Sequence, residues 1–236
     1  HYGLGGALLD LQAWTHWQDA TPVHSQGRLA LRDLHLSPTS GTELDLKLLA
    51  ANFSLARSAD ELRLGLQGVD LATQAHRWPR SDLALALRHD ADGTRHLELA
   101  AGFLRLEHIT ALLQVRVPSA KLGATLDTLQ PRGEVRALRV SAAIGEQALT
   151  WRASAAFRKL HTAPWQHLPG IDNLSGHLLG NHKHLVLNLD SHDTALRSRA
   201  LFREPLELPR IAGRIDWIGA DDGWELSSRS LQIDAK

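Results

Sequence analysis

The sequence predicts a mostly β fold made of long antiparallel strands, each kinked once. Three observations support this: apolar residues recur at every second position, the alternation slips by one residue within several segments, and turn-forming residues separate the segments. In "LRLGLQGVDL", Leu64 and Leu66 have one parity, and Val69 and Leu71 have the other. Because side chains of a strand alternate between faces, we expect a bulge or glycine kink at Gly68, where the register slips.

Two further segments share this construction. In "GRLALRDLHL", Leu29 and Leu31 are followed out of phase by Leu34 and Leu36, so the Arg32-Asp33 step is the expected bend. In "ELDLKLLAANFSLA", even-numbered leucines give way to odd-numbered apolar residues in the same manner. Long strands, each with one kink, are therefore the predicted unit of the chain.

Alternating segments recur along the chain at the spacing typical of an antiparallel meander. The expected strands are 4–14, 27–36, 43–56, 62–73, 82–88, 95–106, 133–143, 148–160, 174–180, 184–190, 195–201, 206–217 and 223–233. Turn signals separate them, among them "SPTSGT" at 37–42, "HDADGT" at 89–94 and "GADDG" at 219–223. Asp-Gly in such turns tolerates the positive φ that tight hairpins require.

One stretch breaks the two-residue period. Between Glu107 and Gln130, apolar residues recur at helical spacing, and prolines punctuate the stretch. The apolar residues are Ile109, Leu112, Leu113, Leu122, Leu126 and Leu129, and the prolines are Pro118 and Pro131. We expect one or two short helices over 107–130, inserted between strands, where they would cover apolar side chains that an open sheet exposes.

Composition and charge exclude several classes of function. The 26 basic and 26 acidic residues cancel, so we expect no nucleic-acid partner and no membrane surface held by charge. The chain has no Cys, which removes disulfides and thiolate sites and is compatible with the periplasm. It has no Met and begins at His1 within an apolar pattern, which we interpret as a piece of a longer protein. No run approaches the roughly 20 apolar residues of a membrane-spanning helix.

Four motifs could carry chemistry, and each has a simpler explanation. His182 and His184 could share a strand face as metal ligands do, but they lie in a polar turn without a placed third ligand, which favours hairpin histidines. The "SHD" stretch at 191–193 is a poor triad, because neighbours in a strand point to opposite faces. "GLGG" at 3–6 and "DADG" at 90–93 lack the other residues of nucleotide and calcium loops. We therefore predict no catalytic residue, no metal and no cofactor.

The choice of apolar residues is unusual. Leucine greatly outnumbers valine and isoleucine, although β-branched residues suit strands better. A leucine-rich surface suits acyl chains, and an ordinary packed core explains the bias equally well.

The aromatic composition is also unusual, with seven Trp residues against one Tyr and four Phe. Five of these Trp residues lie in or beside expected strands: Trp14, Trp151, Trp165, Trp217 and Trp224. For these we prefer the interpretation that the rings fill the core, rather than that they line an apolar binding surface.

The last third of the chain contains motifs specific enough to indicate a family. "APWQHLPGIDNLSGHLLG", "LFREPLELPRIAGRIDW" and "DGWELSSRSLQI" resemble the YhdP family of AsmA-like bacterial envelope proteins, which are relatives of TamB. The resemblance runs from about Gly27 to Ile233. Its signposts are Pro164-Trp165, Leu168-Pro169-Gly170, Leu174-Ser175-Gly176, Phe202-Arg203-Glu204-Pro205-Leu206, Gly213 with Trp217, and Gly223-Trp224.

The resemblance implies an inner-membrane-anchored protein of a Gram-negative bacterium, whose body is an incompletely closed, taco-like β-groove across the periplasm. Such proteins are expected to carry phospholipids between the inner and outer membranes along the apolar groove. The chain would be a single segment, 1–236, of a longer repeating groove. Its expected partners are phospholipid acyl chains, neighbouring segments of the same parent chain and, at the ends of the full-length protein, the membranes. The family's N-terminal membrane helix is missing from this sequence.

The expected groove lining is one set of alternating leucines: Leu44, Leu46, Leu64, Leu66, Leu83, Leu85, Leu97 and Leu99. The mechanism would be passive, because acyl chains prefer an apolar strip while head groups stay hydrated on the open side. Two alternatives stay open. A structural β-spacer or interaction module with a dry packed core would bind no lipid, and an enzyme would need a metal at His182 and His184 or a carboxylate pair in a cleft.

Overall fold

A computed structural model of the chain confirms the fold class. Over the residues that the structure describes, the chain is mostly β, its strands form an antiparallel sheet that does not close on itself, and two short helices are present. The structure describes residues 3–4, 7–19, 21–37, 44–110, 120–146, 149–165, 169–198, 204–220, 223–228 and 230–234. Residues 38–42 of the expected turn and Gly5 and Gly6 of the "GLGG" stretch lie outside the described residues.

The observed strands match most of the predicted segments, but the single strands expected at 4–14 and 223–233 are wrong, because each region contains two separate strands. They are β1 (Gly3–Leu4), β2 (Leu8–Gln18), β3 (Thr21–Ser37), β4 (Leu44–Arg57), β5 (Glu61–Thr73), β6 (Ser81–His89), β7 (Arg95–Arg105), β8 (Arg132–Ile144), β9 (Leu149–Thr162), β10 (Gly170–Asn181), β11 (His184–Arg197), β12 (Leu206–Ala220), β13 (Gly223–Ser227) and β14 (Gln232–Asp234). The separate strands expected at 184–190 and 195–201 are wrong, because β11 continues through 191–193. Asp193 has a φ of 52°, so the interruption is a kink within one strand rather than a turn.

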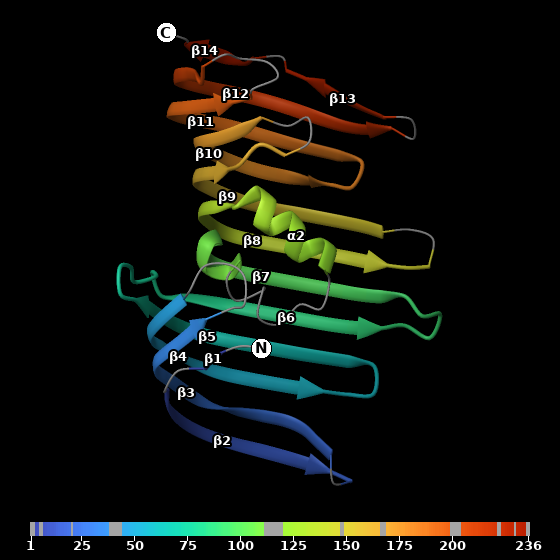
Figure 1. Ribbon diagram of the computed structural model, residues 1–236. Helices are drawn as coiled ribbons and strands as arrows, with labels where there is room; N and C mark the ends of the chain where they lie inside the picture. Colours follow the sequence, from blue (N-terminus) through green and yellow to red (C-terminus); the bar gives the residue numbers. More distant parts are fainter. Residues whose placement is uncertain are drawn as a thin grey trace. The chain divides into compact units, whose positions relative to one another are not determined.

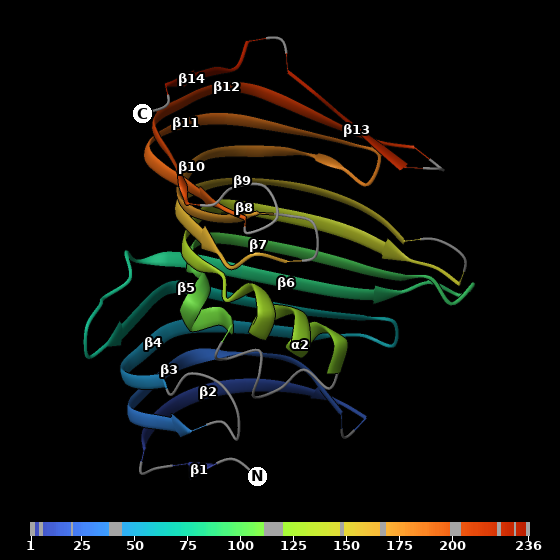
Figure 2. The same ribbon diagram turned by 45° about the horizontal axis from the view of Figure 1, so that its top comes forward.

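The first compact unit comprises residues 1–103 and 137–152. Its strands β3 to β7 follow one another in chain order, each beside the next (Figures 1 and 2). The predicted hairpin at 89–94 is confirmed, with the Asp90 amide donating to the Thr94 carbonyl at 2.8 Å. Gly93 in this turn has a φ of 85°, which glycine adopts without steric cost.

The bends predicted at Gly68 and at the Arg32-Asp33 step are both present in this unit. In β5 the pairing register with β6 shifts between Leu66 and Val69, and Gly68 has a φ of 61°. The extra residue compensates for the change of parity, so Val69 is on the same face as Leu66. The Gly68 amide donates to the Asp82 carboxylate at 2.8 Å, which satisfies a backbone donor that the bulge frees. Asp33 marks the equivalent bend in β3, with a φ of 53°.

Beyond the Gly68 bulge, the first unit has a fully buried apolar core. Val69 and Leu71 are 1% and 3% exposed. Trp78, from the loop between β5 and β6, packs edge-on against Phe103, with ring centroids 5.5 Å apart. The Trp78 amide donates to the Leu71 carbonyl at 2.8 Å, so the loop folds back onto the strand whose side chains its ring helps to bury.

The second compact unit comprises residues 104–136 and 153–236. Strands β10, β11 and β12 are paired over most of their lengths, and β13 and β14 both pair with β12. Its buried core consists of Phe157, Leu189, Leu208 and Ile211. These residues come from three strands and are surrounded by seven half-buried leucines and one isoleucine, so the second unit also buries one face of its sheet.

The helical insertion expected over 107–130 is confirmed. Residues 106–110 are helical, and α2 spans Ala120–Leu129. Leu112 and Leu113 lie outside the described residues. The Ala163 amide donates to the Leu129 carbonyl at 2.7 Å, so the end of α2 is tied to the chain just after β9. Among the described helices, none is long and apolar enough to cross a membrane.

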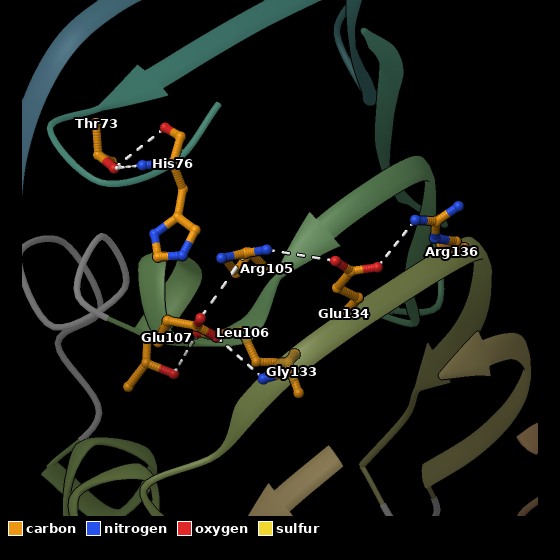
Figure 3. A network of polar contacts seen from close by, with 9 residues as sticks. Thr73, His76, Arg105, Leu106, Glu107, Gly133, Glu134 and Arg136 are labelled. Carbon is orange, nitrogen blue, oxygen red and sulfur yellow. Dashed lines mark hydrogen bonds and ion pairs between the residues drawn. The ribbon is translucent and has the colours of Figure 1, made fainter. Parts of the chain in front are cut away.

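A polar network fixes the start of the insertion to β8 (Figure 3). Glu107 accepts a hydrogen bond from the Gly133 amide at 3.0 Å. Glu134 accepts hydrogen bonds from Arg136 at 2.9 Å and from Arg105 at 3.3 Å. Burial alone would raise the pKa of Glu134, but the two guanidinium groups outweigh it and lower the pKa. The carboxylate therefore stays charged and joins β7 to β8.

Candidate functional site

The strongest candidate site is one face of the sheet in the first unit. Strands β5, β6 and β7 pair so that leucines lie directly opposite leucines in adjacent strands. The cross-strand rows are Leu62 with Leu87 and Leu97, Leu64 with Leu85 and Leu99, and Leu66 with Leu83. We call these eight residues the leucine face. Since directly opposed side chains lie close enough to touch, they form a continuous apolar surface.

All eight residues of the leucine face are half-buried. The residues beyond the bulge are fully buried, whereas the leucine face is accessible along its length. In the described part of the first unit there are only strands and loops, so no described helix of that unit covers this face. An accessible apolar strip on a regular sheet is unusual, and such strips mark binding surfaces.

The opposite face of the same strands has a different chemistry. Arg63, Ala84 and Glu98 alternate with the leucines and are exposed. Arg63 forms a surface ion pair with Glu61, with Nε and Oε1 2.9 Å apart. The sheet is therefore amphipathic, with leucines on one face and charged or small residues on the other.

The structure brings six of the eight predicted lining residues together on the leucine face. Leu46 is elsewhere: it pairs with Leu34 and Thr73, beyond the bulges, and is 2% exposed. The side chain of Leu44 lies outside the described residues. Sequence reasoning missed Leu62 and Leu87, although both share the parity of their neighbours and could have been found by extending the alternation to the strand ends.

Trp14 departs from the expected core role. It is 65% exposed on β2, so the core-filling interpretation is wrong for this residue. The reason is that β2 pairs with β3 alone among the described strands, and all its residues are exposed. Trp151, Trp165 and Trp217 are half-buried, and the side chain of Trp224 lies outside the described residues.

The histidine pair lies at the β10–β11 hairpin, as predicted. His184 Nε2 is 2.9 Å from Asp216 Oδ1, and Arg214 donates to both carboxylate oxygens at 2.7 and 2.6 Å. The hydrogen bonds from Arg214 and then His184 hold the pKa of Asp216 well below its usual range. His184 is thus engaged in a cross-strand hydrogen bond, and no group of three or more His, Asp or Glu in the described chain is arranged to hold a metal.

The "SHD" stretch has a structural role at the kink of β11. Ser191 and Thr194 are 2% and 1% exposed, and their hydroxyl oxygens are 2.8 Å apart. The Ser191 hydroxyl donates to the Asn173 carbonyl at 2.8 Å and accepts from the Ser175 amide at 3.1 Å. These bonds replace sheet pairing where the β10–β11 register shifts, which explains why buried hydroxyls occur there.

A long-stranded, open antiparallel sheet with one accessible leucine face defines a class of protein that offers apolar surface along its strands. Comparison with known proteins identifies the family within that class. A sequence model described as "YhdP protein" matches residues 2–236, so the chain belongs to the YhdP family. The chain is 27% identical over 168 residues to "Intermembrane phospholipid transporter YhdP" of Escherichia coli K12. This match covers 67% of the chain and 13% of that relative. No solved structure matches significantly.

Proposed function

We propose that the chain is a segment of an inner-membrane-anchored periplasmic bridge that carries phospholipids between the inner and outer membranes along the leucine face. The observation that supports this most directly is the set of half-buried leucine rows on an otherwise regular sheet. Membership of the YhdP family supports lipid as the cargo, since the relative is named a phospholipid transporter.

The physical basis of the proposed transport is differential solvation. Each methylene group of an acyl chain gains about 0.8 kcal/mol when it moves from water onto an apolar surface that buries it fully. The rows of the leucine face provide similar contacts on three successive strands, so an acyl chain can move between them without leaving apolar surroundings. A charged head group loses far more on burial and therefore stays in water. No catalytic residue is required for this mechanism.

The proposed bridge continues into neighbouring segments of the same parent chain. Strand β2 is exposed over its whole length, and Leu8, Leu9 and Leu11 are among its exposed residues. An edge strand presents unpaired backbone groups, and natural proteins cover such edges. We infer that adjoining strands of the full-length protein pair with β2, which would place the leucine face within a longer apolar strip.

Mass spectrometry of organic extracts tests the proposal. The chain and its variants Leu66→Asp and Leu85→Asp would be expressed in the periplasm and purified without detergent. Ala84→Asp is the matched control, because it introduces the same charge on β6 at an exposed position of the opposite face. We expect phospholipid with the unmodified chain and Ala84→Asp, and a loss of about tenfold or more in the two leucine variants.

The contrary result is equally clear. If the extracts of folded protein contain no phospholipid, or if Ala84→Asp loses lipid as fully as Leu85→Asp, the leucine face is not the lipid-binding surface. A lipid-free chain with an unchanged fold would favour the structural spacer.

A further inference from the structure

The first unit has a concave surface on the face opposite to its apolar side. This concavity has a volume of about 390 Å³. Its lining residues come from β2, β3, β4 and β5: Gln12, Trp14, Gln26, Gly27, Arg28, Asn52, Phe53, Ser54 and Gln67. The polar ones alternate along their strands with apolar residues such as Leu11, Leu29 and Leu66. The concavity is therefore separated from the leucine face by the thickness of the sheet.

The sheet register aligns the polar side chains of the concavity in a row. Gln12 lies opposite Arg28, Arg28 opposite Asn52, and Asn52 opposite Gln67. With strands about 4.8 Å apart, these four residues span roughly 14 Å across the sheet. A second row places Trp14 opposite Gln26 and Gln26 opposite Ser54. The arrangement is an elongated polar strip with one large aromatic ring beside it.

The chemistry of the strip is neutral and offers both donors and acceptors. Each amide side chain carries an NH₂ donor and a carbonyl acceptor. Gln12, Gln26 and Gln67 are all exposed, so their polar groups are accessible to solvent. Arg28 is the only charged side chain of the lining, and its Nε contacts Asn52 Oδ1 at 3.5 Å. Such a surface matches hydroxyl groups, which also donate and accept.

Two features distinguish this strip from an ordinary polar surface. Trp14 is 65% exposed, and an exposed indole beside amides offers a flat apolar surface for the C–H face of a sugar ring. Gly65 lies opposite Ser54, and a Cβ at position 65 would be 2.7 Å from the Ser54 hydroxyl. The glycine therefore leaves that hydroxyl uncovered at the edge of the strip.

We propose that this strip binds a neutral, hydroxyl-rich glycan, with Trp14 stacking on one sugar ring and the amides bonding to hydroxyls of the next. One guanidinium is too little positive charge for a nucleic acid, and the polar row would leave an acyl chain against unsatisfied amides. Sugar rings of this kind occur in free polysaccharide chains and in the head groups of glycolipids.

Titration followed by NMR tests the proposal, using the indole N–H signals of the chain. The probes are chitotetraose and maltotetraose, as pieces of polysaccharide, and octyl glucoside below its micelle concentration, as a single sugar head group. The signal of Trp14 is assigned by its absence in Trp14→Ala. We expect its shift to saturate with a dissociation constant on the order of 1 mM for at least one probe.

Matched variants decide whether the strip is responsible. Trp14→Ala and Asn52→Ala should each weaken binding by about tenfold, which corresponds to about 1.4 kcal/mol. Trp17→Ala should not, because Trp17 is a similarly exposed Trp of β2 outside the strip. Asn52→Ala also keeps the test valid if Trp14→Ala fails to fold.

The possible outcomes distinguish a polysaccharide ligand from a glycolipid head group, and they also include results that would overturn the proposal. Binding of a tetrasaccharide alone indicates a polysaccharide, and binding of octyl glucoside through Trp14 as well indicates a glycolipid head group. The proposal is overturned if no probe shifts the Trp14 signal, if Trp17→Ala is equally impaired, or if octyl glucoside shifts only methyl signals of the leucine face. None of these results depends on whether the chain carries phospholipid.

Discussion

The two halves of β5 differ in burial although they share a face. Leu64 and Leu66, before the Gly68 bulge, are half-buried, whereas Val69 and Leu71, after it, are fully buried. The difference comes from what covers each half: the loop carrying Trp78 folds back beside the second half. One strand thus contributes to a sealed core that holds the fold and to an accessible surface that is free to bind.

The largest expected effect comes from placing a charge in each half. Leu71→Asp buries an unpaired carboxylate and should lower the free energy of unfolding by about 4 kcal/mol or more. Leu85→Asp should cost only about 1–2 kcal/mol, because a half-buried carboxylate can still reach water. Urea denaturation of both variants measures the difference. Equal losses would mean that the leucine face is as dry as the core, and the comparison would fail.

The bulge itself can be removed to break the shared face. Deleting Gly68 shifts Val69 and Leu71 by one position and turns them to the polar face, which should cost about 3 kcal/mol or more. Gly68→Ala keeps the register, and nothing lies within 4 Å of the added methyl. It should cost only about 1 kcal/mol, for the positive φ alone. If the deletion is as mild as Gly68→Ala in urea denaturation, the bulge does not set the register.

The features of this fold that depend on neighbouring residues in the sequence could be predicted, and those that depend on residues distant in the sequence could not. The slips at Gly68 and Asp33 are local, since two-residue periodicity reveals any change of parity, and both bends were predicted correctly. The continuation of β11 through 191–193 was not predicted, because the hydroxyls that replace its sheet bonds meet partners on β10, and such partners are distant in sequence. The polar concavity was missed for the same reason, as Gln12 and Gln67 come to lie in one row only through the register of four strands.

The hydroxyl cluster in the second unit gives a comparison with a smaller effect. Ser191→Ala removes the side-chain acceptor of the Ser175 amide and one of the two hydroxyl donors to the Asn173 carbonyl, at a buried kink. Unsatisfied buried groups should lower stability by about 1–3 kcal/mol. His192→Ala, at the exposed neighbour, should change stability by less than about 0.5 kcal/mol. Thermal unfolding of the two variants measures this contrast, and similar melting temperatures would show that the kink does not depend on Ser191.

The smallest expected effect is a pH dependence of stability that arises from Asp70, in the buried half of β5 after Gly68. Arg77 bonds to both carboxylate oxygens of Asp70, at 2.9 and 2.5 Å, and Asp70 is itself nearly buried. The hydrogen bond from Arg77 lowers the pKa of Asp70, although burial opposes this, and the charges of Arg77 and Arg80 add to the lowering. A carboxyl group with a lower pKa in the folded state contributes stability above its unfolded pKa, and that contribution is lost as the pH falls through the folded pKa.

The unfolding free energy of the chain should therefore decline below about pH 5 more steeply than that of Asp70→Asn, which cannot lose a charge at this position. At neutral pH, Asp70→Asn should be less stable than the parent, because the amide cannot accept the paired bonds from Arg77 with two anionic oxygens. The two stability curves should converge as the pH falls, since a protonated Asp70 resembles the amide. Urea denaturation across this pH range measures both curves. Parallel curves would show that the charge of Asp70 does not contribute to stability through its pairing with Arg77. Apolar packing around Trp78 would then be sufficient to stabilise this half of the strand.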